Sequence, residues 1–436
     1  MKKIILLCCI IWFANISQAQ SLYFPPTTGN TWDTLSASSL GWCTDKLDTL
    51  YDYLEANNSK AFILLKNGRI VFEKYFGTFT VDSAWYWASA GKTLTSFVVG
   101  VAQQESFLSI NDTTSDYLGT GWTIAPPQKE QAITIRNQLT MTSGLDDGVP
   151  DNHCTIDTCL EYLADAGTRW AYHNGPYTLL DSVIESATGS TLNNYLQQKV
   201  KTPTGMTGLF IKVDFDNVYY SKPRSMARFG LLMLNKGKWD NTPVLTDTVY
   251  YNSMISTSQL LNPSYGYLWW LNGKSSYMVP GLQIQIPGSF SPNAPADMYA
   301  ALGKNGQMLN VVPGDSLIWL RMGDAPNAGT VPFLMNDTIW QKLNQIMCTP
   351  NAVANMDARK LTVNVYPNPA VSFLNIDVKN GEYDVELCDL SGRLLIKQKV
   401  NHGKISINTA NLQSGIYLLS VMTKDGKQVS KINVSH

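Results

Sequence analysis

The distribution of tryptophan divides this chain into two unlike parts. All twelve tryptophans lie at or before Trp340, and the chain beyond it consists of short runs in which apolar and polar residues alternate. Alternation with a period of two predicts half-buried β-strands. Seven such runs occur, at residues 361–366, 373–378, 383–390, 394–400, 405–407, 416–423 and 429–434. Because the turn pairs Ser391-Gly392 and Asp425-Gly426 punctuate them, residues 361–436 are predicted to form a small all-β sandwich.

The larger part, residues 20–348, combines the periodicities of strands and helices. Apolar residues recur at helical spacing after Ser89, and longer helical patterns cover 177–200 and 225–235. Strand-like runs lie at both ends, at residues 62–66, 69–76, 265–271, 298–302, 308–312 and 316–321. This order predicts an α+β domain, in which helices flank one antiparallel sheet that a helical insertion interrupts. The bland stretch 349–360 reads as a linker to the sandwich.

The first nineteen residues have the organisation of a signal peptide. Lys2 and Lys3 precede an apolar stretch, residues 4–13, that is too short to span a bilayer. Ser17-Gln18-Ala19 offers small residues for cleavage after Ala19, and the alternative reading is a buried first strand. Since no later segment is long and apolar enough to cross a membrane, we expect an exported mature protein without a transmembrane segment.

Charge and motif content exclude several classes of function. The formal net charge is -1, which offers no basic surface to a nucleic acid. The chain has 4 histidines and no Cys-x-x-Cys pattern, and it lacks both a Walker loop and a dinucleotide-binding glycine motif. We therefore predict no metal, no cofactor and no nucleic-acid partner.

Five cysteines remain after the leader, and export permits disulfides. Cys154 and Cys159 could close a short loop, while Cys43 and Cys348 could join the ends of the large domain. Spacing alone leaves the pairing open. We expect Cys388, which lies in a strand-like run, to be a buried apolar residue.

The clearest candidate for chemistry is Ser89-Ala90-Gly91-Lys92. Residues three apart at the start of a helix share a face, so the lysine ammonium can reach the serine oxygen. The helix N-terminus adds positive potential where an oxyanion would form. The alternative is an ordinary capping serine followed by a solvated lysine.

Two further motifs are weaker alone. Tyr172-His173-Asn174 precedes a long helical pattern, where side chains can point into a cleft, and nearby ammonium groups would lower the phenol pKa from its usual value of about 10. The alternative is a tyrosine that caps the helix. Lys304-Asn305-Gly306 follows Gly303, and a glycine within a strand lets a substrate backbone approach closely. The alternative here is a hairpin turn.

In this order the three motifs resemble the serine β-lactamase and penicillin-binding superfamily, whose members carry SxxK, Tyr-x-Asn and Lys-x-Gly. The Tyr-x-Asn form is similar to the branch of class C β-lactamases, D-Ala-D-Ala carboxypeptidases, esterases and 6-aminohexanoate-dimer hydrolases. The resemblance covers about residues 45 to 345. It implies a β-lactamase/transpeptidase-like fold. His173 stands where the family usually has a small residue, and Asn305 replaces a threonine, so both could alter the substrate.

The resemblance also implies roles for individual residues. Ser89 would be the nucleophile, Lys92 its activating partner and Tyr172 the shuttle that carries the proton to the leaving group. Either Lys92 or Tyr172 could be the general base. The groups that would bind substrate or stabilise the oxyanion are Asn174, Lys304, Gly306 and Gln307, with the N–H groups of Ser89 and Gln307 forming the oxyanion hole.

Four residues in or near these motifs are also considered for a place in the site. We expect the His173 imidazole to turn toward the helix or solvent, so that its position next to Tyr172 matters more than its ring. Trp170, Trp269 and Trp270 are candidates to line the cleft, with core packing the alternative for at least one of them.

These roles imply a secreted serine hydrolase that forms an acyl-enzyme on an ester or amide. The substrate would be a small molecule or peptide, and esterase or amidase, D-Ala-D-Ala carboxypeptidase-like and β-lactamase-like activities all suit the same groups. The alternative is a non-catalytic protein that binds or senses a cell-wall or β-lactam ligand on the same fold.

The tail resembles the type IX secretion sorting domain of Bacteroidetes. The resemblance rests on Val365-Tyr366-Pro367-Asn368-Pro369, Asp389-Leu390-Ser391-Gly392-Arg393, Ser414-Gly415-Ile416-Tyr417 and Lys431-Ile432-Asn433-Val434. It implies export across the outer membrane by the type IX machinery and release or anchoring at the cell surface. A carbohydrate-binding or adhesive module is the alternative.

Overall fold

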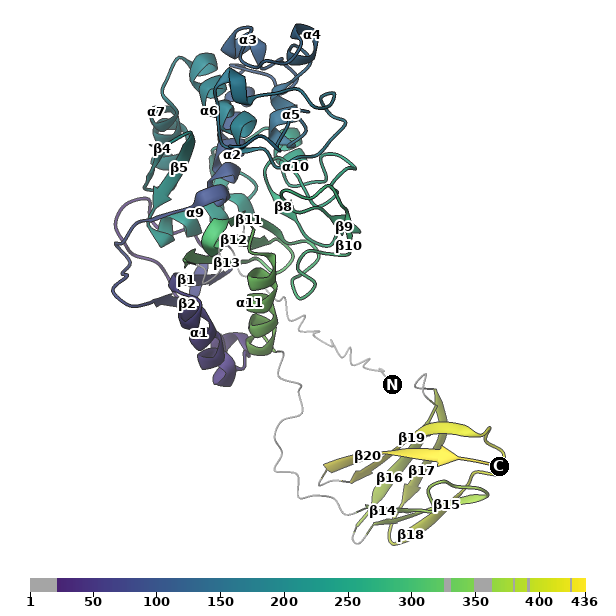
Figure 1. Cartoon of the computed structure of the whole chain (residues 1–436). Coiled ribbons are helices and arrows are strands. Elements are labelled where there is room, and N and C mark those ends of the chain that lie inside the picture. The colour runs from purple at the N-terminus through teal and green to yellow at the C-terminus, as the bar shows by residue number, and fades with distance from the viewer. Residues whose placement is uncertain (1–21, 325–330, 349–362, 379–380, 390–392, 424–425) are drawn as a thin grey trace, which may run out of the picture. The chain divides into compact units, whose positions relative to one another are not determined.

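The computed structural model describes residues 22–324, 331–348, 363–378, 381–389, 393–423 and 426–436. They form two compact units that meet in the sequence near residue 350 (Figure 1). The predicted leader, the predicted linker and the turn residues 391–392 and 425 lie outside the described residues.

A six-stranded antiparallel sheet with the order β2-β1-β13-β12-β11-β8 forms the framework of the first unit (Figure 1). Its strands are β1 (Ser59–Lys66), β2 (Arg69–Tyr75), β8 (Trp270–Leu271), β11 (Tyr299–Gly303), β12 (Gln307–Val312) and β13 (Leu317–Gly323). The first strand of the unit, β1, pairs with its last strand, β13. The chain between β2 and β8 is therefore an insertion between strands of one sheet. The predicted interrupted sheet is thus confirmed.

The helices of this unit are α1 (Leu47–Ala56), α2 (Lys92–Gln104), α3 (Ser115–Leu118), α4 (Pro127–Glu130), α5 (Ile135–Leu139), α6 (Asn174–Thr188), α7 (Leu192–Leu196), α8 (Thr202–Thr204), α9 (Pro223–Leu234), α10 (Thr248–Met254) and α11 (Phe333–Ile346). Smaller strands are β3 (Trp85–Tyr86), β4 (Leu209–Val213), β5 (Asp216–Ser221), β6 (Lys238–Trp239), β7 (Thr242–Pro243), β9 (Ser276–Tyr277) and β10 (Ile286–Pro287). Of these, β3, β5 and β4 form a separate three-stranded sheet.

Helices cover both faces of the main sheet. On one face α9 packs against β1, β12 and β13, because Leu309 and Ile318 point toward its Gly230. Asn310 points the other way and accepts a hydrogen bond from Trp340 of α11 at 3.0 Å. Alternate residues of β12 therefore face helices on opposite sides of the sheet, which is why every residue of this strand is buried.

One predicted helix is wrong in its extent. The pattern over 177–200 is divided into two helices in the structure. Gly189, with the left-handed φ of 64°, follows the last residue of α6, and Thr191 caps the start of α7. The helix pattern over 225–235 corresponds to α9 and is confirmed.

Both candidate disulfides form. Cys43 joins Cys348 across 305 residues of sequence, and Cys154 joins Cys159 across 5. Cys388, expected to be buried, is instead half-buried and has a free thiol.

The second unit is the expected β-sandwich, with strands at all seven predicted places. One sheet has the order β14-β15-β18 and the other the order β17-β16-β19-β20. The strands are β14 (Val363–Tyr366), β15 (Phe373–Val378), β16 (Tyr383–Cys388), β17 (Leu394–Val400), β18 (Lys404–Asn408), β19 (Gly415–Thr423) and β20 (Gly426–Val434). Inward residues such as Leu374, Val385 and Leu419 form a separate core.

None of the helices in the described part of the chain combines the length and apolar character that a membrane crossing requires.

Replacing both Cys43 and Cys348 by serine should destabilise the first unit by about 2–4 kcal/mol, because the open chain gains conformational freedom when unfolded. Thermal unfolding under non-reducing conditions measures this as a lower Tm. Cys388→Ser, which breaks no bridge, serves as the control. An unchanged Tm in the double variant would mean that the bridge contributes no stability.

Candidate active site

Ser89 is held at the junction of a short turn and a buried helix. It lies in the 3-10 turn η3 (Ala88–Gly91), which leads directly into α2. Residues 94, 97, 98 and 101 of α2 are buried, as the helical spacing predicts. Ala88 has a φ of 46°, a left-handed conformation that is unfavourable for a residue with a side chain. The hydroxyl is thereby presented from a backbone that its surroundings constrain tightly.

Lys92 is directed at the Ser89 hydroxyl. Its Nζ donates to Ser89 Oγ at 3.3 Å, and its side chain is only 4% exposed. The ammonium also lies 3.8 Å from the centre of the Tyr177 ring, a cation–π contact. Burial lowers the pKa of Lys92 to about 7, although Asp216 and Asp181 act in the opposite direction. The amine can therefore lose its proton near neutral pH.

Tyr172 completes the group around Ser89. Its phenol lies close enough to the Ser89 side chain for that group to affect the phenol pKa, and its ring stacks on Trp270 at 6.1 Å with an interplanar angle of 14°. Burial raises the phenol pKa well above its ordinary value, an effect that the Ser89 side chain only partly offsets. The expected lowering of this pKa is therefore wrong, since loss of water around the phenol outweighs any neighbouring positive charge. Tyr172 stays protonated at neutral pH.

Asn174, the first residue of α6, does not bond to Lys92. Its Nδ2 donates to Asn152 Oδ1 at 2.8 Å and lies 3.3 Å from His153 Nε2. Its Oδ1 is buried without a hydrogen-bond partner in the described structure. Asn174 does not line the cavity in front of Ser89, so its expected contact with a substrate stays a prediction.

Lys304 reaches the same cavity from the turn η6 (Lys304–Gly306) between β11 and β12. The motif is thus a hairpin turn, the alternative that spacing left open, and its lysine nevertheless lines the same cavity as Ser89. Asn305 has a φ of 62°, which asparagine tolerates better than threonine does, and it donates to Tyr86 Oη at 2.7 Å.

Gly303 fixes the position of β11 against the serine. A Cβ at this position would lie 2.6 Å from the Trp87 carbonyl oxygen and 3.1 Å from the Ser89 nitrogen. The sequence suggested that this glycine admits a substrate backbone. In the structure it admits the backbone of the segment that carries Ser89.

Gly306 and Gln307 lie next to the cavity but do not line it. Gly306 has a φ of 77°, and its carbonyl accepts a hydrogen bond from Arg321 at 2.8 Å. The Gln307 side chain is fully buried and bonds to the backbone N–H and carbonyl of Gly323. Both residues anchor the hairpin, and the role expected for the Gln307 N–H stays a prediction.

The His173 imidazole is buried rather than turned to solvent. It is 2% exposed, and both ring nitrogens are without hydrogen-bond partners in the described structure. Burial lowers its pKa to about 4, so the ring is neutral at pH 7.

Trp170, Trp269 and Trp270 are also buried and line no part of the cavity. Core packing is therefore the reading that holds for all three.

The cavity in front of Ser89 has a volume of about 530 Å³. Its wall includes residues that the sequence did not single out, among them Tyr86, Asp151, His153, Tyr177, Asp214, Phe215 and Asp216. His153 Nδ1 lies within hydrogen-bond distance of Asp216, 2.8 Å from its Oδ2. No local sequence pattern could identify His153 and Asp216 as a pair, because the first comes from the loop before Cys154 and the second from the β4–β5 hairpin.

Within the described residues, no group of three or more His, Cys, Asp or Glu side chains is arranged to hold a metal ion. What the site brings together is a hydroxyl, an amine that loses its proton near pH 7 and a phenol that retains its own. These are the groups needed for attack by a serine oxygen on a carbonyl carbon.

Lys92→Met should make the protein more thermally stable below pH 7. The buried ammonium binds its proton less readily in the folded than in the unfolded state, so its cost is complete below a pH of about 7 and disappears as the pH rises toward 10.5. Each unit of pKa shift corresponds to about 1.4 kcal/mol. Measured Tm values between pH 5 and 10 should show a gap between variant and wild type that narrows with rising pH. A gap of constant size would contradict this account.

Gly303→Ala should disrupt the site. The added methyl group meets backbone atoms of Trp87 and Ser89 that cannot move independently, so the serine segment must shift. Displacements of about 1 Å can cost roughly 100-fold in rate. Gly91→Ala is the matched control, because its Cβ would meet Tyr219 at 3.4 Å and Trp87 at 3.8 Å, both ordinary contact distances. Labelling of Ser89 by an active-site probe measures both variants, and equal rates would refute the steric argument.

Comparison with known proteins agrees with this geometry. A family model described as Beta-lactamase matches residues 53–322, and one described as Secretion system C-terminal sorting domain matches residues 364–435. The chain is similar in structure to a candidate β-lactamase from Bacteroides dorei DSM 17855, with 19% identity and a TM-score of 0.56 over 70% of this chain and 99% of that one.

Two other solved structures have the same fold. A candidate 6-aminohexanoate-dimer hydrolase from Bacillus anthracis has 16% identity and a TM-score of 0.54 over 74% of this chain and 89% of its own. A family VIII carboxylesterase has 13% identity and a TM-score of 0.50 over 69% and 98%. At such identities the likeness establishes the fold alone. Because the first family model spans more than half of the sequence, the chain belongs to the β-lactamase family, and its tail is a secretion-system sorting domain.

Proposed function

We propose that this protein is a secreted serine hydrolase that cleaves an ester or amide through an acyl-enzyme on Ser89. The observation that carries the proposal is the 3.3 Å contact between Ser89 Oγ and the buried Lys92 Nζ, whose pKa is about 7. A non-catalytic binding protein would not require an amine held in this state beside a hydroxyl.

In the first step, neutral Lys92 accepts the proton of the Ser89 hydroxyl as Oγ attacks the carbonyl carbon. Tyr172, which retains its proton at neutral pH, donates it to the departing oxygen or nitrogen. The phenol then regains a proton from the Lys92 ammonium. Lys92 is thus the proposed general base, because the raised pKa of Tyr172 makes a resting phenolate unfavourable.

The negative oxygen of the intermediate would be stabilised by backbone donors. We propose the N–H groups of Ser89 and Gln307, each worth about 3 kcal/mol if well placed. The two hydrogen bonds between the Gln307 side chain and Gly323 support this role by immobilising the residue. Lys304, which lines the cavity, would bind a polar group of the substrate. Attack by water on the acyl-Ser89 ester completes hydrolysis.

We favour esterase or amidase activity over a dedicated β-lactamase. The solved structures of this fold include a carboxylesterase and a candidate 6-aminohexanoate-dimer hydrolase as well as a candidate β-lactamase, and no sequence feature marks this chain for antibiotic turnover. The sorting domain indicates type IX secretion to the surface or exterior of the cell, and we propose that the leader is removed during export. Nitrophenyl esters, a cephalosporin and a D-Ala-D-Ala peptide, assayed side by side, would identify the substrate class.

A fluorophosphonate probe or a labelled penicillin should modify the intact protein but not Ser89→Ala. The rate of labelling should rise with pH through about 7, because only the neutral form of Lys92 can accept the serine proton. Mass spectrometry of the labelled peptide identifies the modified residue. Label on another residue, or none with either probe class, would contradict the proposal. Saturable binding without turnover would instead favour a sensor of cell-wall or β-lactam ligands.

A further inference from the structure

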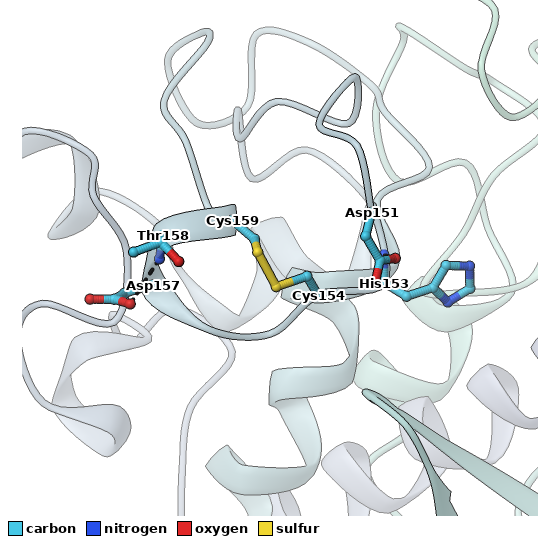
Figure 2. The surroundings of a disulfide bond; sticks show 6 residues. All are labelled: Asp151, His153, Cys154, Asp157, Thr158 and Cys159. Atoms are coloured by element: carbon cyan, nitrogen blue, oxygen red, sulfur yellow. Dashed lines mark hydrogen bonds between the residues drawn. A yellow bond between two sulfur atoms is a disulfide. The ribbon is translucent and has the colours of Figure 1, made fainter.

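A disulfide-bridged loop contacts the segment that carries Tyr172. The Cys154–Cys159 bond closes residues 154–159, and the bridged loop is defined as residues 151–159, which include the three residues before that closure. Figure 2 shows the His153 ring projecting away from the bond. Cys154 is buried, and its carbonyl oxygen lies only 2.3 Å from where a Cβ of Gly175 would be. The loop and the start of α6 are therefore in direct backbone contact, which a glycine at position 175 permits.

Asn152 makes three hydrogen bonds to this segment. Its Nδ2 donates to the Tyr172 carbonyl at 3.3 Å, and its Oδ1 accepts from Asn174 Nδ2 at 2.8 Å. Its backbone carbonyl accepts from the Gly175 N–H at 2.9 Å. One residue thus binds three of the four consecutive residues from 172 to 175.

These bonds are compatible with one arrangement of the amides. Because the Tyr172 carbonyl can only accept, Asn152 must present its nitrogen there and its oxygen to Asn174. Asn174 then uses its second N–H toward His153 Nε2, which accepts at 3.3 Å. The ring proton of His153 therefore lies on Nδ1, where it is donated to Asp216 at 2.8 Å. The network connects the Tyr172 backbone to His153 and Asp216, which line the cavity.

We propose that Asn152 is a positioning residue: supported by the Cys154–Cys159 bridge, it fixes the backbone of residues 172–175 so that the Tyr172 phenol stays within reach of Ser89. This inference rests on the proposed function, in which Tyr172 delivers a proton to the leaving group. The bridge contributes by closing the chain two residues after Asn152, which restricts the conformations the loop can adopt.

The test compares Asn152→Ala with Asn193→Ala. Asn193 is a matched control, because its side chain also makes two hydrogen bonds, to the N–H and carbonyl of Phe210, at a place that does not line the cavity. With the best nitrophenyl ester, kcat of Asn152→Ala should fall about 10- to 100-fold with less than a threefold change in KM. The Asn193 variant should keep kcat within threefold.

The bridge is tested in the same way. Cys154→Ser/Cys159→Ser should lower kcat about tenfold, whereas Cys43→Ser/Cys348→Ser should lower Tm and leave kcat within threefold. Hydrogen exchange, followed by mass spectrometry, should become faster in peptides covering 172–177. The two control variants should not show this change, which is expected only in Asn152→Ala and in the Cys154/Cys159 variant. Wild-type kcat and unchanged exchange in these variants would overturn the proposal.

Two further outcomes are separable. If the wild type neither labels at Ser89 nor turns over any substrate, the proposed function fails, and the exchange data still decide whether Asn152 orders residues 172–177.

If Asn152→Ala does not fold, Asn152→Asp tests the role of the Tyr172 contact, because it keeps the acceptor for Asn174 and loses the donor to Tyr172. It should show a reduced kcat with the native Tm, and a wild-type kcat would refute the role of the Tyr172 contact.

Discussion

Burial of the Lys92 ammonium beside Ser89 is the constraint on which the site depends. Within the described structure no carboxylate lies within ion-pair distance of this amine. A direct partner would keep the lysine protonated and remove its capacity to accept the serine proton. The two carboxyl groups that act on the pKa of Lys92 are bonded to other residues, since Asp181 accepts a hydrogen bond from Asn217 at 2.9 Å and Asp216 bonds to His153. Their charges act on Lys92 without neutralising it.

Aromatic rings take the place of water around this amine. The Tyr177 ring lies beneath Lys92 Nζ, and Trp270 covers the face of Tyr172. A π face attracts a cation more weakly than a carboxylate does, so it would tolerate the ammonium that the proposed reaction forms without holding the proton permanently. The same exclusion of water lowers the pKa of the amine and raises that of the phenol, which separates base from acid.

Much of this arrangement follows from the sequence, and the exceptions have physical causes. Periodicity predicted the long strands of the main sheet, and the Ser89–Lys92 contact followed from helical spacing, because both are local properties. The run 265–271 is a strand only at Trp270–Leu271, and the sheet β3-β5-β4 was not predicted. The break after α6 was missed because the apolar pattern continues through Gly189. The phenol pKa was predicted in the wrong direction, because motif residues reveal charges but not the depth of burial. His153, Asn152 and Asp216 act through contacts distant in sequence.

The parts of the site are joined mainly by backbone contacts, and this explains its precision. Gly303 brings β11 against the N–H of Ser89, and Gly175 brings the start of α6 against the carbonyl of Cys154. Backbone atoms have few soft degrees of freedom, so segments that meet without intervening side chains cannot drift by rotamer changes. A proton transfer between Ser89, Lys92 and Tyr172 needs donor–acceptor distances held near 3 Å. Two glycines and one bridged loop supply that accuracy where the long side chain of Lys92 alone would not.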